Sequence, residues 1–280
     1  MLERGEGRRH LDRMLSRLFP NRPARQPSRT PADCVVWAVG DIHGRSDLAD
    51  RLIQAIRADL HGSAATRNVV VFLGDHVDRG LDSRGVLDQL CNLAVDPALE
   101  VRFVRGNHED RMEAFLRDPQ VGPSWCDYGG RDTLASYGVR PPSMRGDAQA
   151  WAEASRALSE ALPESHHDLL ARQEYSVSIG DYFFVHAGAR PGVGLAAQSP
   201  EDLMWIRQPF LEHAGLFEQV IVHGHTPAEV VHSDNRRIGI DTGAYATNVL
   251  SAVRLEDQTR VVMQATGRAG RVSIATAPLT

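Results

Sequence analysis

The sequence predicts an α/β (α+β) fold in which two packed mixed β-sheets are flanked by helices, with a helical insert. Two observations lead to this class. Strand and helix patterns alternate over residues 33–117 as β-α-β-α-β, which is typical of parallel strands covered by helices. From residue 174 onward, strand patterns follow one another directly, which is typical of hairpins. The 280 residues have room for one large domain or two small ones.

The elements of the first half follow from apolar spacing. DCVVWAVG, residues 33–40, is a β-branched run closed by glycine, and this pattern predicts a buried strand. Residues 46–60 place apolar side chains at helical spacing behind a candidate N-cap serine. The same two patterns recur as strands at 68–74 and 100–106 and as helices at 83–94 and 109–117.

Beyond this unit the pattern changes twice. Residues 117–172 show little strand signal and several short helical patches, so we expect a helical insert there. Strand patterns then return in six segments, at residues 174–180, 181–188, 219–224, 236–243, 249–256 and 260–265.

Residues 1–32 are expected to form an arm outside a single folded domain that spans 33–280. Residues 8–19 carry apolar side chains on one helical face and arginines on the other. Such a basic helix suits an anionic membrane surface, the body of the protein, or a second copy. Packing is favoured, because a helix this short is marginal in isolation. Residues 20–31 contain four prolines and are expected to be an extended linker.

Composition narrows the classes of function. All 31 basic residues are arginine, so lysine chemistry such as a P-loop or a Schiff base is excluded. The net charge is −5, with +5 in residues 1–29 and −10 in the remainder, and a body this acidic argues against nucleic-acid binding. Three widely spaced cysteines form no zinc or CxxC pattern. With neither a secretory signal nor a long apolar run, we expect a cytoplasmic protein with no transmembrane segment and reduced thiols.

Polar residues gather where predicted strands end. Five such ends carry the groups Asp41-Ile42-His43, Asp75-His76-Val77-Asp78-Arg79, Arg105-Gly106-Asn107-His108-Glu109, His186 and His223-Gly224-His225. Because ligands of α/β sheets bind beyond the carboxyl ends of strands, we expect these groups to meet at one edge.

Carboxylate, amide and imidazole ligands together suit a borderline divalent ion such as Mn²⁺, Fe²⁺ or Zn²⁺. The strand ends supply six such side chains: Asp, His, Asp, Asn, His and His. Six ligands are too many for one ion that must also admit a substrate, but they suit two ions that share one carboxylate. Two adjacent metals clamp a phosphate and activate a water, so the residues predict hydrolysis of phosphate esters.

The blocks GDIHG (40–44), GDHVDRG (74–80), RGNHE (105–109), HAG (186–188) and GHT (224–226) resemble the signatures of PPP-type serine/threonine protein phosphatases. These belong to the calcineurin-like metallophosphoesterase superfamily. Order and spacing resemble the bacterial and phage branch, which includes the phage lambda phosphatase. Trp125–Gly130 and Thr133–Gly138 also look like a segment of that branch, with no catalytic role implied. The resemblance implies a four-layer metallophosphoesterase sandwich for the catalytic domain.

The resemblance also implies roles by matching position. One metal would be held by Asp41, His43 and Asp75, and the second by Asp75, Asn107, His186 and His225, with His223 as the alternative to His225. His108 resembles the general acid and Asp78 the carboxylate that orients it. Arg79, Arg105 and Arg207 resemble the arginines that grip phosphate. His76 stands where the family has tyrosine or an apolar residue, and we expect it to point away from the metals.

These roles predict a metal-dependent phosphomonoesterase in which a metal-bridging water attacks phosphorus. The expected substrates are phosphoserine and phosphothreonine proteins or small phosphate esters, with manganese as the expected metal and iron or zinc as options. The alternative is a symmetrical bis-nucleosyl tetraphosphate (dinucleoside polyphosphate) hydrolase. Net charge favours the first, because a body at −10 is a poor host for a polyphosphate. A non-catalytic binding module would have lost a ligand, and none is lost. The oligomeric state stays open.

Overall fold

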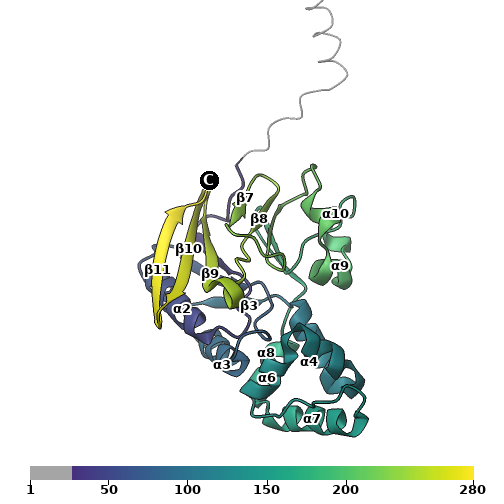
Figure 1. The fold of residues 1–280 in the computed structure, drawn as a ribbon. Helices are drawn as coiled ribbons and strands as arrows, with labels where there is room; N and C mark the ends of the chain where they lie inside the picture. The colour runs from purple at the N-terminus through teal and green to yellow at the C-terminus, as the bar shows by residue number, and fades with distance from the viewer. Residues whose placement is uncertain (1–26) are drawn as a thin grey trace, which may run out of the picture.

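The computed structural model describes residues 27–280 and contains two mixed sheets, as predicted (Figure 1). The six-stranded sheet has the order β11-β10-β9-β1-β2-β3 and the five-stranded sheet the order β4-β5-β6-β8-β7. The first sheet consists of β1 (Cys34–Val39), β2 (Arg67–Phe72), β3 (Glu100–Phe103), β9 (Val249–Glu256), β10 (Thr259–Arg268) and β11 (Arg271–Pro278). The second consists of β4 (Ser176–Ile179), β5 (Tyr182–Val185), β6 (Val220–His223), β7 (His232–Ser233) and β8 (Arg237–Gly239).

The first sheet is parallel in one half and antiparallel in the other, whereas the second has a parallel centre and antiparallel edges. β1, β2 and β3 pair in parallel, whereas β9 joins β1 antiparallel. In the second sheet β5, β6 and β8 pair in parallel, and β4 and β7 are added antiparallel. The carboxyl ends of the parallel strands in each sheet therefore lie at a common edge, where the predicted site residues follow.

The buried strands separate two interiors. Val36 and Ala38 of β1 lie in the core between the sheets, together with Phe184 and Val222 of the second sheet. Side chains alternate across a strand, so Trp37 of β1 faces the helices instead. This two-sided burial explains why the β1 segment is apolar throughout rather than alternating.

Helices cover the outer faces and complete four layers (Figure 1). α2 (Ser46–His61) and α3 (Ser83–Ala94) pack on the first sheet with Leu52 and Leu90 among the buried side chains. α9 (Pro200–Trp205) and α10 (Gln208–Leu211) cover the second sheet, and Phe210 packs against Phe183 and Ile221. A single turn, α11 (Ala244–Thr247), precedes β9.

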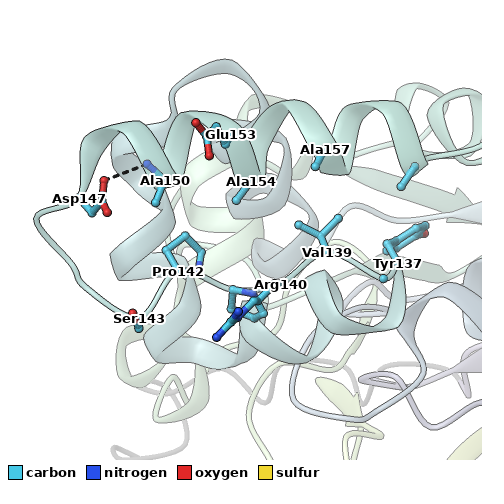
Figure 2. Close-up of a pocket in the computed structure, with 13 residues that line it drawn as sticks. Tyr137, Val139, Arg140, Pro142, Ser143, Asp147, Ala150, Glu153, Ala154 and Ala157 are labelled. Carbon is cyan, nitrogen blue, oxygen red and sulfur yellow. Dashed lines mark hydrogen bonds between the residues drawn. The ribbon is translucent and has the colours of Figure 1, made fainter.

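Helices fill the segment predicted as an insert. They are η1 (Pro119–Val121), α5 (Gly122–Trp125), η2 (Cys126–Gly130), α6 (Arg131–Ser136), α7 (Ala148–Ala161) and α8 (Glu164–Ala171). With α4 (Asn107–Arg117) they form a lobe at the lower end of the molecule in Figure 1. Figure 2 shows a pocket of about 540 Å³ between α7 and the loop from Tyr137 to Ser143, and none of the predicted site residues lines it.

Two strands were not predicted, and one helix begins earlier than predicted. β11 was not predicted; it forms a hairpin with β10 through Ala269 and Gly270, both at positive φ, and its alternate side chains are exposed. β7 is only two residues long and gave no sequence signal. α4 begins at Asn107 rather than 109, because the Glu109 carboxylate accepts the Gly106 amide and caps the helix there.

The predicted basic helix and most of the predicted linker lie outside the described residues. The end of the linker belongs to the folded body, because Ser28 and Thr30 are buried. The Thr30 amide donates to the Asp257 carbonyl at 3.1 Å, and the Tyr182 hydroxyl donates to the Ser28 carbonyl at 3.1 Å. Over residues 27–280, no helix has the length and apolar character needed to cross a membrane.

Candidate metal centre and active site

The loops that follow the strands hold several site residues in the left-handed region. Positive φ angles occur at His43, Asp75, Asp78, Arg79 and His225, a conformation that costs energy for residues with a side chain. Loop contacts stabilise it. The amide of His43 donates to the Asp75 carbonyl at 2.8 Å, which ties the β1 loop to the β2 loop.

Glu109 fixes the β2 loop against α4. Its buried carboxylate accepts the amides of Asp75 at 2.9 Å, His76 at 2.7 Å and Gly106 at 3.0 Å. Glu109 lies within the RGNHE block, but no role was predicted for it. Its position three residues after the glycine that caps α4 was the available signal.

Asp75 lies at the centre of the site and divides its two oxygens. Oδ1 lies 3.4 Å from Nε2 of His186, whereas Oδ2 lies 3.5 Å from Nε2 of His43 and 3.9 Å from Nε2 of His108. Asp75 therefore belongs to two buried donor clusters, one with His186 and His225 and the other with His43 and His108. This is the arrangement expected of a carboxylate shared by two cations.

The cluster around His186 contains a fourth donor. Asn107 Oδ1 lies 2.9 Å and His225 Nδ1 3.1 Å from His186 Nε2. The far nitrogens are also oriented, since His186 Nδ1 lies 2.8 Å from the Leu73 carbonyl and His43 Nδ1 lies 2.9 Å from the Val77 carbonyl. Each Nδ1 donates to its carbonyl, which leaves the Nε2 lone pair directed at the centre.

Burial and charge make this donor set suitable for cations. Burial lowers the pKa of His43 to about 3 and that of His225 to about 2, so both rings are neutral. His225 Nε2 is buried and has no hydrogen-bond partner within residues 27–280. Burial opposes protonation of His186 too, yet Asp75 raises its pKa to about 10. The neutral rings of His43 and His225 and the crowded carboxylates fit divalent metal ions, and a cation bound beside Asp75 would displace the extra proton of His186.

Asp41, which the resemblance implies as a metal ligand, lies beside the donor clusters. Its carboxylate accepts the His225 amide at 3.0 and 3.2 Å and belongs to neither donor cluster, although it is buried beside them. Burial and the neighbouring Asp241 raise the pKa of Asp41. Asp241, also buried, was not singled out from the sequence; burial raises its pKa to about 6. Asp41 stays a predicted ligand.

His108 and Asp78, to which the resemblance gives the roles of acid and orienting carboxylate, are in contact. His108 Nδ1 lies 2.7 Å from Asp78 Oδ2, and burial raises the pKa of Asp78. Two side chains of the insert hold the same carboxylate: Trp125 Nε1 donates at 2.8 Å, and the Thr133 hydroxyl donates at 2.6 Å. Both residues lie in the segment that resembles the bacterial branch, for which no role in the site was predicted.

The three predicted phosphate-gripping arginines differ in their surroundings. Arg79 lies 3.1 Å from Nε2 of His108, and Arg207 donates to the Thr226 hydroxyl beside His225 at 3.2 Å. Arg105 is instead engaged by carboxylates, with Glu113 at 2.8 Å and Asp110 at 3.2 Å. Its charge is therefore already balanced within the protein.

The remaining histidines of the motifs lie away from the donor clusters. His76 is buried beside the stacked rings of Phe72 and Phe103, with ring centroids 6.1 and 6.2 Å away. The His223 ring contacts Phe210, and its Nε2 lies 3.1 Å from a guanidinium nitrogen of Arg237. His225, not His223, joins Asp75 and His186.

Two packed sheets with a carboxylate shared between two donor clusters define a metallophosphoesterase. Residues 34–261 match the family described as Calcineurin-like phosphoesterase, and the chain belongs to that family.

Among similar proteins, a symmetrical bis(5'-nucleosyl)-tetraphosphatase of Acidovorax is 30 % identical over 66 % of this chain, a match that spans about half (51 %) of the relative's length. An asymmetrical bis(5'-nucleosyl)-tetraphosphatase PrpE of Geobacillus thermodenitrificans is 29 % identical, over 68 % of this chain and 76 % of its own. A crystal structure assigned as a diadenosine tetraphosphatase aligns with a TM-score of 0.55 and 18 % identity, over 89 % of this chain and 95 % of its own, and indicates the fold alone.

Proposed function

We propose that this hydrolase cleaves the phosphoanhydride chain of dinucleoside polyphosphates with the help of two divalent metal ions. Metal-dependent hydrolysis is supported by one observation: the two oxygens of the Asp75 carboxylate face two different buried donor clusters. The substrate class is supported by the tetraphosphatase names of the sequence relatives. This reverses the preference drawn from the sequence, which placed phosphoproteins first.

The metal sites would be assembled from the residues already described. Asp75, Asn107, His186 and His225 would hold one ion, and Asp75, His43 and Asp41 the other. When bound, the ions would supply charge neutralisation at the phosphate and a nucleophilic water at neutral pH. Manganese suits this mixture of oxygen and nitrogen donors, and iron and zinc are the other options.

Residues of the chain would donate the proton to the leaving group and offset the negative charge of the phosphates. Asp78 accepts Nδ1–H of His108 and so keeps Nε2 directed into the site. Burial opposes protonation of His108, but Asp75 and Asp78 raise its pKa, so the imidazolium would carry a second proton on Nε2 and give it to the leaving phosphate oxygen. Arg79 and Arg207, each close to one donor cluster, offset charge on the phosphate chain. Burial of the His108–Asp78 pair keeps water from competing for this hydrogen bond.

The proposal is tested with the full chain after chelation and reconstitution with Mn²⁺, Fe²⁺ or Zn²⁺. Diadenosine tetraphosphate, a phosphoserine peptide and an aryl phosphate are compared by kcat/KM at one metal concentration. We expect chelation to abolish all activity and the dinucleotide to exceed the peptide by at least about tenfold. A higher kcat/KM for the peptide would restore the phosphoprotein hypothesis and leave the metal centre in place.

A further inference from the structure

Two partly exposed aromatic rings stand at the two ends of the donor array. The ring of Tyr245 lies 5.4 Å from that of His43, and the ring of Trp205 lies 6.3 Å from that of His225. Tyr245 is 39 % exposed and Trp205 37 % exposed, whereas most aromatic side chains of the core are buried. His43 and His225 belong to different donor clusters, so each of the two rings contacts a different one of the clusters that share Asp75.

Tyr245 is held rigidly beside the first cluster. It lies on the single turn α11, whose carbonyl at Ala244 accepts a hydrogen bond from Arg45 at 2.9 Å. Arg45 also donates to the Asn248 side chain at 2.8 Å, which fixes the other end of the turn. The guanidinium of Arg79 lies over the tyrosine ring, 4.8 Å from its centroid.

Trp205 is held in a similar way beside the second cluster. It is the last residue of α9, which is tied to the loop after β5 by the hydrogen bond from the Ala187 amide to the Leu203 carbonyl at 2.8 Å. The guanidinium of Arg111 lies 5.3 Å from the centre of the indole. Trp205 also lines a surface pocket of about 340 Å³ together with Arg207. A pocket of this volume is in the range of small-ligand sites.

We propose that Trp205 and Tyr245 are the specificity-determining platforms on which the two nucleobases of a dinucleoside polyphosphate stack. This inference rests on the proposed function and deepens it. A ligand with a flat ring at each end and an anionic chain between them matches a site that has an aromatic ring beside each donor cluster and, between the rings, the donors that would hold two cations. Aromatic side chains stack on any base, because every base has a π-face. Phosphoserine offers no ring to either platform.

The test compares a substrate with bases and a substrate without them. Trp205→Ala and Tyr245→Ala are assayed with diadenosine tetraphosphate and with inorganic tripolyphosphate, which has the same type of bond. Loss of one stacked base lowers affinity about tenfold, so the kcat/KM ratio of dinucleotide to tripolyphosphate should fall by about that factor in each variant. Tyr245→Phe retains the ring and should restore the ratio. Tyr175→Ala is the matched control, because Tyr175 is 42 % exposed and lines a separate pocket.

A binding measurement tests the tryptophan without turnover. The other three tryptophans, Trp37, Trp125 and Trp151, are buried, so quenching of fluorescence by a stacked base reports on Trp205. Titration of the chelated protein with ADP should quench the signal saturably, ribose 5-phosphate should not, and Trp205→Phe should lose the response.

The outcomes separate the two proposals. Suppose that the wild-type chain hydrolyses the dinucleotide, but the alanine variants lose activity equally on both substrates or ADP does not quench the fluorescence. That result overturns the platforms and leaves the proposed function intact. No dinucleotide hydrolysis by the wild-type chain, while tripolyphosphate or a phosphopeptide is cleaved, overturns both. A phosphopeptide whose turnover falls more than that of the dinucleotide in Trp205→Ala assigns the ring to peptide binding and also overturns the platforms.

Discussion

Replacing Thr133 by valine removes a single hydroxyl that contacts Asp78 twice. The Thr133 hydroxyl donates to Asp78 Oδ1 at 2.6 Å and accepts the Asp78 amide at 2.9 Å. Both residues are fully buried, so water cannot replace the lost contacts. A hydrogen bond to a charged group contributes about 1.5–3 kcal/mol. If the transition state uses all of it to hold His108 in place, kcat falls by about 10- to 150-fold.

We would measure kcat and metal content of the Mn²⁺-loaded protein. The substrate is an alkyl phosphate, because its poor leaving group needs protonation. Thr133→Ser keeps the hydroxyl and should retain most of the activity. Ser136→Ala, one turn along the same helix, removes a hydroxyl that contacts the Thr133 carbonyl and not Asp78, and serves as the matched control.

A double-mutant cycle decides whether Thr133 acts through the His108–Asp78 pair. In the His108→Asn background, Thr133→Val should have little further effect on kcat, because the group that it positions is already gone. Additive losses in the two backgrounds would refute the reasoning, as would full activity of Thr133→Val. Metal content should match the wild type throughout.

Three further changes follow from the same contacts. Asp75→Asn should abolish turnover and lower metal content, and two bound ions with normal turnover would contradict the shared carboxylate; metal analysis and kcat decide it. His108→Asn should retain metal while kcat on alkyl phosphates falls by about 10²–10⁴-fold, with a smaller loss on aryl phosphates; equal losses would argue against an acid. Burial would raise the pKa of Asp234, but the backbone amides of Arg237 and Arg236 outweigh it and lower that pKa. The Asp234 carboxylate therefore stabilises the fold above the ordinary carboxyl pKa, and this stabilisation is lost as pH falls through the pKa of the folded state. Asp234→Asn should therefore lower Tm at pH 7, with a gap that narrows below about pH 4; a gap independent of pH would exclude this account.

Much of the site was predictable because parallel strands impose an order on their ends. Once the strands before Asp41, Asp75 and Asn107 are recognised, the geometry of a parallel sheet brings the residues after them to one edge. The buried strands themselves were recognisable because burial on both faces requires continuous apolar runs. β11 lacked that signal, since it pairs only with β10 and leaves most side chains exposed.

The supporting contacts were not predictable, because they join segments that are distant in the chain. Trp125 and Thr133 reach Asp78 across 47 and 55 residues, and nothing in local spacing indicates that pairing. Asp241 and Asp41 are brought together by the packing of the two sheets. A helical insert with a conspicuous tryptophan is more often a folding unit than part of a site, so its contact with Asp78 required the tertiary structure.

Net charge is the wrong measure of how this protein receives a polyphosphate, because electrostatic interactions in salt act over short distances. Charges farther apart than about 10 Å are largely screened at 0.1 M salt, so a substrate responds to the groups around it rather than to the −10 carried by the body. Near the donor clusters, Arg79 contacts His108, and Arg207 contacts Thr226 beside His225. Arg105, by contrast, is neutralised by Glu113 and Asp110 and adds little positive potential there. Removing the charge of Arg207 should therefore weaken binding of a polyanion more than removing any acidic surface residue strengthens it, and net charge gives no reason to prefer phosphoserine.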